Sequence, residues 1–325
     1  MIAYIFRRLG FAALSIWVIS VVAFAIIQLP AGGARPEQAP FALRISRAYG
    51  MTGPFHERYG KWVWALLHGD LGRSYMFFET NSPTERTVRE VIGDRLWLTV
   101  ALAGFTILVT WTMAIPIGIY SAVRHHSIGD YVFTTLGFSG LAVPDFLLGL
   151  VLMYVAFAYL GQSVGGLFSF EYQFDDSWSW AKARDLFKHL WIPAAVLGTS
   201  GTASLIRILR NNLLDELGKP YLVTARAKGV PALRAILKYP VRVAVNPLVS
   251  TVGYLVPSLI SGSVIVSVVL SLPTLGPVLL QSIIQEDVFL AGFIILMLGV
   301  LTVIGTLLSD ILLAVVDPRI RFTGR

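Results

Sequence analysis

Six long apolar stretches constrain the fold of this chain more than any other feature. They lie at residues 10–29, 97–121, 131–160, 189–209, 245–270 and 289–316. A helix needs about 20 mostly apolar residues to cross the roughly 30 Å hydrocarbon layer of a bilayer. The 325 residues are 55% hydrophobic and only 14% charged, which is far more apolar than an ordinary soluble domain. We therefore predict an all-α integral membrane protein with six transmembrane helices.

The first and fourth stretches differ from the others. Residues 10–29 follow Arg7 and Arg8 and are longer than the apolar core of a signal peptide, so they read as a retained anchor. Residues 189–209 have a small, polar middle, and such residues favour close helix packing within membranes. We expect this fourth helix to face protein or a cavity.

Basic residues between the stretches predict the orientation. Eight of them lie from Arg207 to Arg242, between the fourth and fifth stretches. Nine more lie in residues 30–96, but a loop of about 67 residues has little influence on topology. Because positive charge in short loops marks the cytoplasmic side, we predict that both termini are cytoplasmic. The excess positive charge of +7 then lies at the cytoplasmic face of the membrane, next to lipid, and requires no nucleic-acid partner to explain it.

Motifs for catalysis and metal binding are scarce. The sequence has no cysteine, and the adjacent His125 and His126 lack a third ligand nearby. It contains no Gly-x-x-x-x-Gly-Lys-Ser/Thr loop for binding nucleotide phosphates. Residues 161–165 match the nucleophile pattern Gly-x-Ser-x-Gly, with His189 as a nearby base, but follow a membrane span instead of a strand. We expect no catalytic, cofactor-binding or metal-binding residue, with an intramembrane serine hydrolase as the alternative of another class.

The segment between the fourth and fifth stretches carries signals for one short helix. Pro220 suits a first turn, residues 225–228 are good helix formers, Gly229 is placed as a C-terminal cap and Pro231 prevents continuation. Small residues allow close backbone approach and cations suit an acidic rim, so such a helix can dock in a groove of a soluble partner. An amphipathic helix lying on anionic lipid is the alternative.

This segment resembles the coupling loop of ABC importer permeases, in the branch that transports dipeptides, oligopeptides and nickel. The resemblance rests on Tyr221, on Thr224-Ala225-Arg226-Ala227-Lys228-Gly229 and on residues 242–247. It extends along nearly the whole chain, with further matches at residues 6–9, 69–75, 115–118, 122–124, Asp130, Pro144, Phe146, 189–198, Arg207, 271–276, Asp287, Asp310 and 317–321. Three places depart from the family pattern: Val223 replaces a glutamate, Ser267 replaces an acidic residue, and residues 29–33 replace a Pro-Gly-Asp-Pro sequence.

The resemblance implies a type I ABC importer permease fold. Residues 1–96 would form an anchor and a large extracytoplasmic loop, residues 97–316 the permease core with a coupling loop at 210–244, and residues 317–325 a cytoplasmic tail. The chain would be a pore subunit in a bacterial or archaeal cytoplasmic (inner) membrane. Its implied partners are a second homologous permease, two ATP-binding cassette subunits that bind ATP and Mg, and an extracytoplasmic substrate-binding protein. The residues expected to contact the ATPase are Tyr221, Thr224, Ala225, Arg226, Ala227, Lys228 and Gly229.

The branch implies di- or oligopeptides as substrate, with oligosaccharides or nickel complexes as alternatives. Asp145 lies near mid-depth in the third stretch, where an ionisable group is costly unless it faces a cavity or a partner. It belongs either to the translocation path or to a structural kink at Pro144. Asp310 is expected to pair with an inner cation such as Arg207 or Arg210. The amphipathic residues 59–67 dock the binding protein, cover the pore mouth or pack on lipid.

Overall fold

A computed structural model describes residues 2–28, 54–74, 86–162, 165–173, 175, 177–251, 264–285 and 287–316. Several predicted features lie outside these residues: positions 29–33, Tyr75, Ser163 of the nucleophile-like pattern, and the tail at 317–325. In the described part of the chain, every element is a helix except two paired two-residue strands, which confirms the all-α prediction there.

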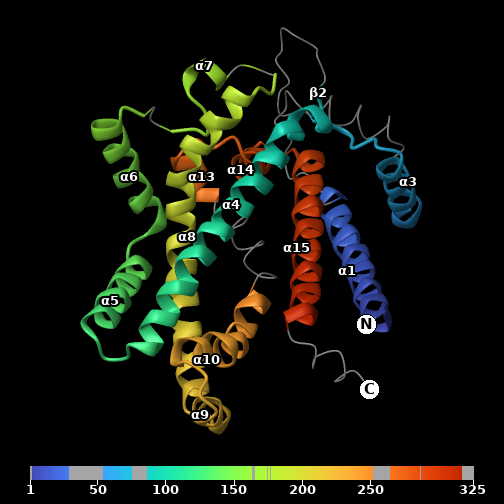
Figure 1. Ribbon diagram of the computed structural model, residues 1–325. Coiled ribbons are helices and arrows are strands. Elements are labelled where there is room, and N and C mark those ends of the chain that lie inside the picture. The colour runs from blue at the N-terminus through green and yellow to red at the C-terminus, as the bar shows by residue number, and fades with distance from the viewer. Residues whose placement is uncertain are drawn as a thin grey trace.

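The elements follow one another from the N-terminal anchor to a long C-terminal helix (Figure 1). They are α1 (Ile2–Gln28), α3 (Phe55–Leu67), β1 (Arg73–Ser74), β2 (Arg86–Thr87), α4 (Val88–Val123), α5 (Ile128–Ala142), α6 (Asp145–Leu160), α7 (Phe170–Gln173), α8 (Trp180–Leu217), α9 (Pro220–Ala227), α10 (Ala232–Lys238), α11 (Pro240–Ala244), α13 (Val264–Val269), α14 (Leu275–Ile284) and α15 (Val288–Val316).

Four helices are each long and apolar enough to cross a membrane, at Phe6–Ile26, Val88–Val123, Trp180–Leu217 and Phe289–Leu312. The helices α5 and α6 pass the same test together but meet at an angle of 105°, so they form one broken span or a re-entrant loop. The described residues therefore hold four or five candidate spans. The middle of the predicted fifth span, 245–270, falls on residues 252–263, which lie outside the described residues.

Two of the helices begin earlier than the apolar pattern predicts. At α4, the Thr87 hydroxyl accepts from the backbone N–H of Glu90 while the Glu90 carboxylate accepts from the N–H of Thr87, which is a complete capping box. At α8, the Ser179 hydroxyl accepts from the N–H of Lys182. Hydrophobic runs locate the lipid-crossing part of a helix, whereas these caps set where the helix starts.

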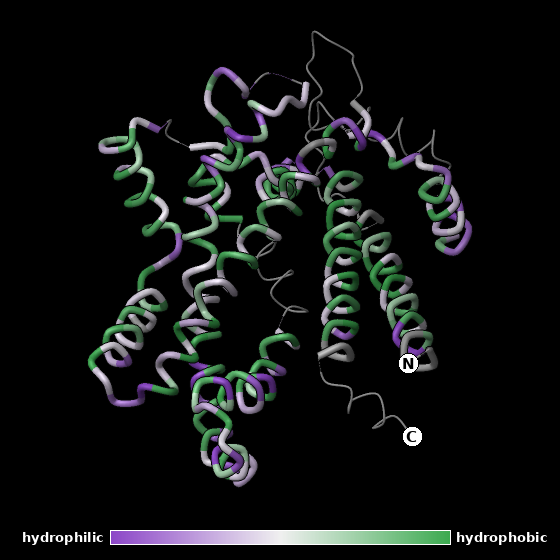
Figure 2. Tube along the Cα trace, viewed as in Figure 1, coloured by the Kyte–Doolittle hydropathy of each residue, from purple (hydrophilic) through white to green (hydrophobic). Residues whose placement is uncertain are grey.

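The tube coloured by hydropathy shows that the long helices are mostly apolar through their middles, with polar residues gathered toward the ends and in the connections (Figure 2). The helices α9 and α10 lie at one end of the molecule, and α7, α13 and β2 lie toward the other (Figure 1). The N-terminal end of α1 points toward the same end as α9 (Figure 1).

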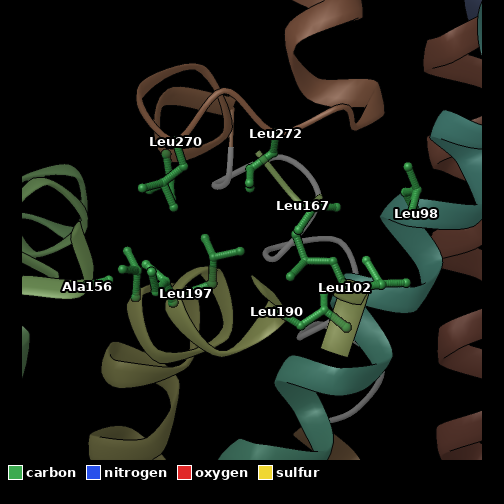
Figure 3. Close-up of a cluster of buried hydrophobic side chains, with 12 residues drawn as sticks. Leu98, Leu102, Ala156, Leu167, Leu190, Leu197, Leu270 and Leu272 are labelled. Atoms are coloured by element: carbon green, nitrogen blue, oxygen red, sulfur yellow. The ribbon is translucent and has the colours of Figure 1, made fainter. Parts of the chain in front are cut away.

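The centre of the molecule is the pair α4 and α8. A Cβ built on Gly198 would lie 2.9 Å from the Thr110 hydroxyl oxygen, and one built on Gly118 would lie 3.0 Å from Leu209, so the two helices approach closely. The predicted packing role of the small residues in the fourth stretch is therefore observed. Toward the end that holds α7, leucines of α4 and α8 join Leu167, Leu270 and Leu272 in one buried cluster (Figure 3).

A second pair, α1 and α15, stands beside this centre (Figure 1). A Cβ on Gly299 would lie 2.5 Å from Ile19, and the Arg8 guanidinium lies 3.0 Å from the Asp310 carboxylate. Asp310 therefore pairs with a cation, as predicted, but that cation is Arg8 and neither Arg207 nor Arg210. The helix α3 packs its aromatic side on this pair, with Trp62 buried against Phe24. For the opposite side of α3, contact with the binding protein, the pore mouth or lipid stays a prediction.

The short hairpin β1–β2 fixes the outer loop to the start of α15. The Ser74 hydroxyl donates to the Asp287 carboxylate over 2.6 Å, and the other oxygen of that carboxylate accepts from the N–H of Leu290. Asp287 is fully buried and caps the first turn of α15. The hydrogen bond between Ser74 and Asp287 thereby joins two segments that are 213 residues apart in the sequence.

Candidate functional site

The short helix α9 forms where the sequence predicts it. Pro220 occupies its first turn, and Gly229 follows its end with a left-handed φ of +80°. The N–H of Gly229 donates to the carbonyl of Arg226, and the N–H of Val230 donates to the carbonyl of Ala225. This pair of bonds is a Schellman motif, which glycine accommodates without the steric penalty that other residues pay at positive φ. The predicted helix and its predicted cap are both present.

One side of α9 is held against the rest of the chain. Leu222 and Ala225 are buried, and together with Ala235 of α10 they form a small apolar cluster flanked by Leu217 and Tyr239. The Tyr221 hydroxyl donates to the Glu216 carboxylate over 2.5 Å, which links α9 to the last turn of α8. Burial, and then the hydrogen bond to Glu216, raise the pKa of Tyr221 well above its usual range. The hydroxyl therefore stays protonated at neutral pH.

The other side of α9 is exposed. Of the seven residues predicted to contact a partner, Tyr221, Thr224, Arg226, Ala227, Lys228 and Gly229 are exposed, whereas Ala225 is buried under the helix. Val223, which the prediction passed over, is 66% exposed on the same surface. The exposed surface therefore combines the small residues Thr224, Ala227 and Gly229 with two cations near its C-terminal end. It lies at the extreme of the molecule (Figure 1).

A buried ion pair joins α5 to α8 near the end of α8 that leads to α9. The Arg210 guanidinium of α8 donates two hydrogen bonds of 2.9 Å to the Asp130 carboxylate of α5. Asp130 is only 2% exposed and also accepts from the backbone N–H of His126. Bidentate arginine–carboxylate pairs fix geometry as well as charge. This pair joins the start of α5 to the unbroken helix that leads into α9.

Sequence reasoning noted both residues of this pair without bringing them together. Asp130 was matched only as a position in the family pattern, and Arg210 was named only as a possible partner of Asp310. The two are 80 residues apart, and no local pattern relates them. Arg207, three residues before Arg210, is exposed and has no ion-pair partner in the described part of the chain.

Asp145 lies at the break between α5 and α6. Val143 is extended, Pro144 precedes the new helix, and Asp145 is its first residue. A carboxylate in the first turn interacts favourably with the helix dipole. Asp145 is partly buried, and Ala142, Val143 and Pro144 beside it are exposed. The kink expected at Pro144 is therefore present, and the Asp145 carboxylate lies at the break between α5 and α6.

The described residues do not test the alternative serine-hydrolase pattern, because Ser163 lies outside them. His189 is buried, and its Nδ1 lies 2.9 Å from the backbone carbonyl oxygen of Asp185, in the same helix. The rings of His125 and His126 stack on each other. Among the residues that the structure covers, no group of three potential metal ligands occurs.

Comparison with known proteins gives one family and full-length relatives. A family described as binding-protein-dependent transport system inner membrane component matches residues 114–322. The oligopeptide transport system permease protein AppB of Bacillus subtilis is 34% identical, over 99% of this chain and 100% of the relative. The dipeptide transport system permease protein DppB of Escherichia coli K12 is 29% identical, over 99% of each chain. A putative peptide permease protein of Brucella ovis is 28% identical, over 99% of this chain.

Proposed function

This chain belongs to the family of binding-protein-dependent transport system inner membrane components, and on that premise we propose that it is the pore subunit of a peptide importer. It is a multi-pass permease of the inner membrane, and the ATP that drives such a transporter is hydrolysed by separate subunits. The observation that carries the peptide assignment is similarity over 99% of the chain to permeases of oligopeptide and dipeptide transport systems. The substrates we propose are di- or oligopeptides.

We further propose that α9 couples the pore to the ATPase subunits. Its exposed surface has short side chains that allow a close approach, and Arg226 and Lys228 offer charge to an acidic groove. Its buried side, with Leu222 and Ala225, ties it to α10. Ala225 then holds the helix in place, and the exposed residues make the contact. Closure of two ATPases would move α9 and, through α8, the helices that form the pore.

The full architecture we propose has six spans and both termini in the cytoplasm. Two features support it: cationic α9 and the N-terminal end of α1 lie toward the same end of the molecule, and α10 and α13 lie toward opposite ends (Figure 1). We propose that the chain crosses the membrane between α10 and α13, as the predicted fifth span at 245–270. The proposed division at residue 96 falls inside α4, three residues after the non-helical Gly93, and this kink supports a core that begins there.

The assembly we propose contains a second homologous permease, two ATP-binding cassette subunits that bind ATP and Mg, and an extracytoplasmic substrate-binding protein. Within it, Asp145 would line the translocation path. Its carboxylate stands at a backbone break inside an otherwise apolar pair of helices, where it can attract the ammonium group that every free peptide carries. The substrate-binding protein would deliver the peptide from the outer side.

The substrate assignment is tested by purifying the chain with its natural partners and identifying the ligand that the associated binding protein carries. Recovery of di- or oligopeptides supports the proposal. Recovery of oligosaccharides or of nickel complexes overturns the substrate class while leaving the permease assignment intact.

The coupling role of α9 is tested by charge reversal. Arg226→Glu is expected to lower substrate-stimulated ATP hydrolysis and uptake about tenfold, because a central arginine typically contributes more than 1 kcal/mol to an interface. The matched control is Arg124→Glu, which reverses an exposed cation at the end of α4. Equal loss in both variants would show that α9 has no special role.

A further inference from the structure

A cavity of about 240 Å³ lies between α5 and α8, beside the ion pair of Asp130 and Arg210. Thr134, Arg207, Arg210 and Asn211 are among its lining residues, and so are Leu141 and Ala203. It lies beside the place where a Cβ on Gly137 would come within 3.6 Å of the Cβ of Ala203. The two helices are therefore in close contact beside the cavity.

The cavity is polar at one end and apolar at the other. The ion pair between Asp130 and Arg210 and the contact of Gly137 with Ala203 fix α5 and α8 as antiparallel neighbours. Arg210 and Asn211 therefore lie toward the end that holds α9, whereas Leu141 and Ala203 lie deeper along the spans. A ligand that fits this gradient has a polar head facing the α9 end and an apolar tail.

The charge of the cavity is positive. The guanidinium of Arg210 is neutralised by Asp130, which is 2% exposed and has both carboxylate oxygens engaged with it. Arg207 lines the same cavity, is exposed, and has no acidic partner in the part of the chain that the structure describes. Thr134 and Asn211 add hydrogen-bonding groups. The cavity thus offers one unneutralised cation and several polar groups to an anion.

We propose that this cavity binds the phosphate headgroup of an anionic phospholipid of the cytoplasmic leaflet, with Arg207 as the cation that holds it. Basic pockets between transmembrane helices on the cytoplasmic side are suited to such headgroups. The first methylenes of an acyl chain would lie along Leu141 and Ala203. Free phosphate shares the headgroup chemistry but leaves the apolar end of the cavity unfilled. The proposal rests on the orientation proposed above, in which α9 is cytoplasmic.

The lipid would sit between two helices with different tasks. The helix α5 leads to the break at Asp145, and α8 leads to α9. A headgroup on Arg207 would therefore brace these helices beside the ion pair of Asp130 and Arg210. This makes the anionic lipid content of the membrane a determinant of how firmly the broken span is held to α8.

The test measures lipid binding and needs no transport assay, so it does not depend on the peptide assignment. The full-length permease, with its partner subunits, is delipidated and placed in phosphatidylcholine nanodiscs containing graded amounts of phosphatidylglycerol. Bound phosphatidylglycerol is then quantified by native mass spectrometry. The variants are Arg207→Gln, Arg207→Lys and the control Arg124→Gln, which removes an exposed cation at the same end but outside the cavity.

Arg207→Gln is expected to lower phosphatidylglycerol affinity about fivefold, because one basic side chain near an anionic headgroup is worth about that factor. Arg207→Lys and Arg124→Gln are expected to bind as the unchanged protein does. Equal binding in Arg207→Gln and the unchanged protein overturns the proposal. Displacement of the lipid by millimolar inorganic phosphate overturns the lipid assignment in favour of a simple anion site, and displacement by a substrate peptide places the cavity on the translocation path instead.

Discussion

The helices α8 and α5–α6 both contain a proline, yet one runs unbroken for 38 residues and the other bends by 105°. In α8, Ile192, Pro193 and Ala194 are all buried in the centre of the molecule. At the break, Val143 and Pro144 are exposed and Val143 is extended. The residue before a proline resists the helical conformation, and packing around α8 overrides that preference. Pro116 is exposed within α4, which is also unbroken there, so a proline permits a break in a span without imposing one.

The largest effect should come from cutting the link between these two regions. Arg210→Gln leaves the buried Asp130 carboxylate without its partner and is expected to destabilise the permease by about 3 kcal/mol. Asp130→Asn is expected to cost less, because Arg210 is partly exposed and can be solvated. Thermal unfolding of the purified proteins measures both. A larger loss in Asp130→Asn would show that the pair is not held through its buried carboxylate.

The next effect concerns the packing that keeps α8 unbroken. Gly198→Ala places a Cβ 2.9 Å from the Thr110 hydroxyl oxygen, so either Thr110 or the two helices must shift, at an expected cost of about 2 kcal/mol. Gly104→Ala on α4 is the matched control, because its Cβ meets nothing within 4 Å. Denaturation midpoints for the two variants should differ clearly. Equal midpoints would mean that the close approach is not what stabilises α8.

The break itself can be tested by exchanging each proline. Pro144→Ala removes the clash that keeps Val143 extended and is expected to shift the balance toward a straighter span by about 1 kcal/mol, or roughly fivefold in population. Because the chain has no cysteine, spin labels can be introduced at the exposed Leu136 and Val151 and their separation measured. The separation should lengthen in Pro144→Ala. Pro193→Ala should leave it unchanged, and lengthening in both would contradict the comparison.

The smallest effect should be at the cap of α9. A Cβ on Gly229 meets nothing within 4 Å, so Gly229→Ala costs only the strain of a positive φ, about 1 kcal/mol at this one position. We expect fraying of α9 and a lower ratio of uptake to ATP hydrolysis, with the assembled complex unchanged. Gly229→Asn, which tolerates this backbone conformation, should retain more of the ratio. An unchanged ratio of uptake to ATP hydrolysis in Gly229→Ala would show that the helix cap plays no part in coupling.

Local signals in the sequence were enough to predict α9, its cap, the kink at Pro144 and the apolar cores of four single spans. These depend on proline, glycine and hydrophobic runs, which act over a few residues. The bend of the third span was not predicted in size, because it depends on what packs around Val143. The early starts of α4 and α8 were missed because capping residues, Thr87 and Ser179, stand outside the apolar runs.

Contacts between distant segments could not be predicted in detail. Arg8 is the partner of Asp310, and only the fold brings together two residues that lie near opposite ends of the sequence. The burial of Ala225 was missed for a related reason. Its small size predicted contact with a partner, but the face of α9 that points inward is set by Leu222 and by α10.

The pairing of α1 with α15 has a consequence for how the protein is made. Among the described residues these are the first and the last helix, so α1 is synthesised long before the helix that it packs against. Ribosomes add roughly 5–20 residues per second, so α1 waits in the bilayer on the order of tens of seconds before α15 emerges. Only a chain translated through α15 can close this pair, and an interrupted one leaves α1 without that partner. The bond between Arg8 and Asp310 therefore forms only after α15 has been made.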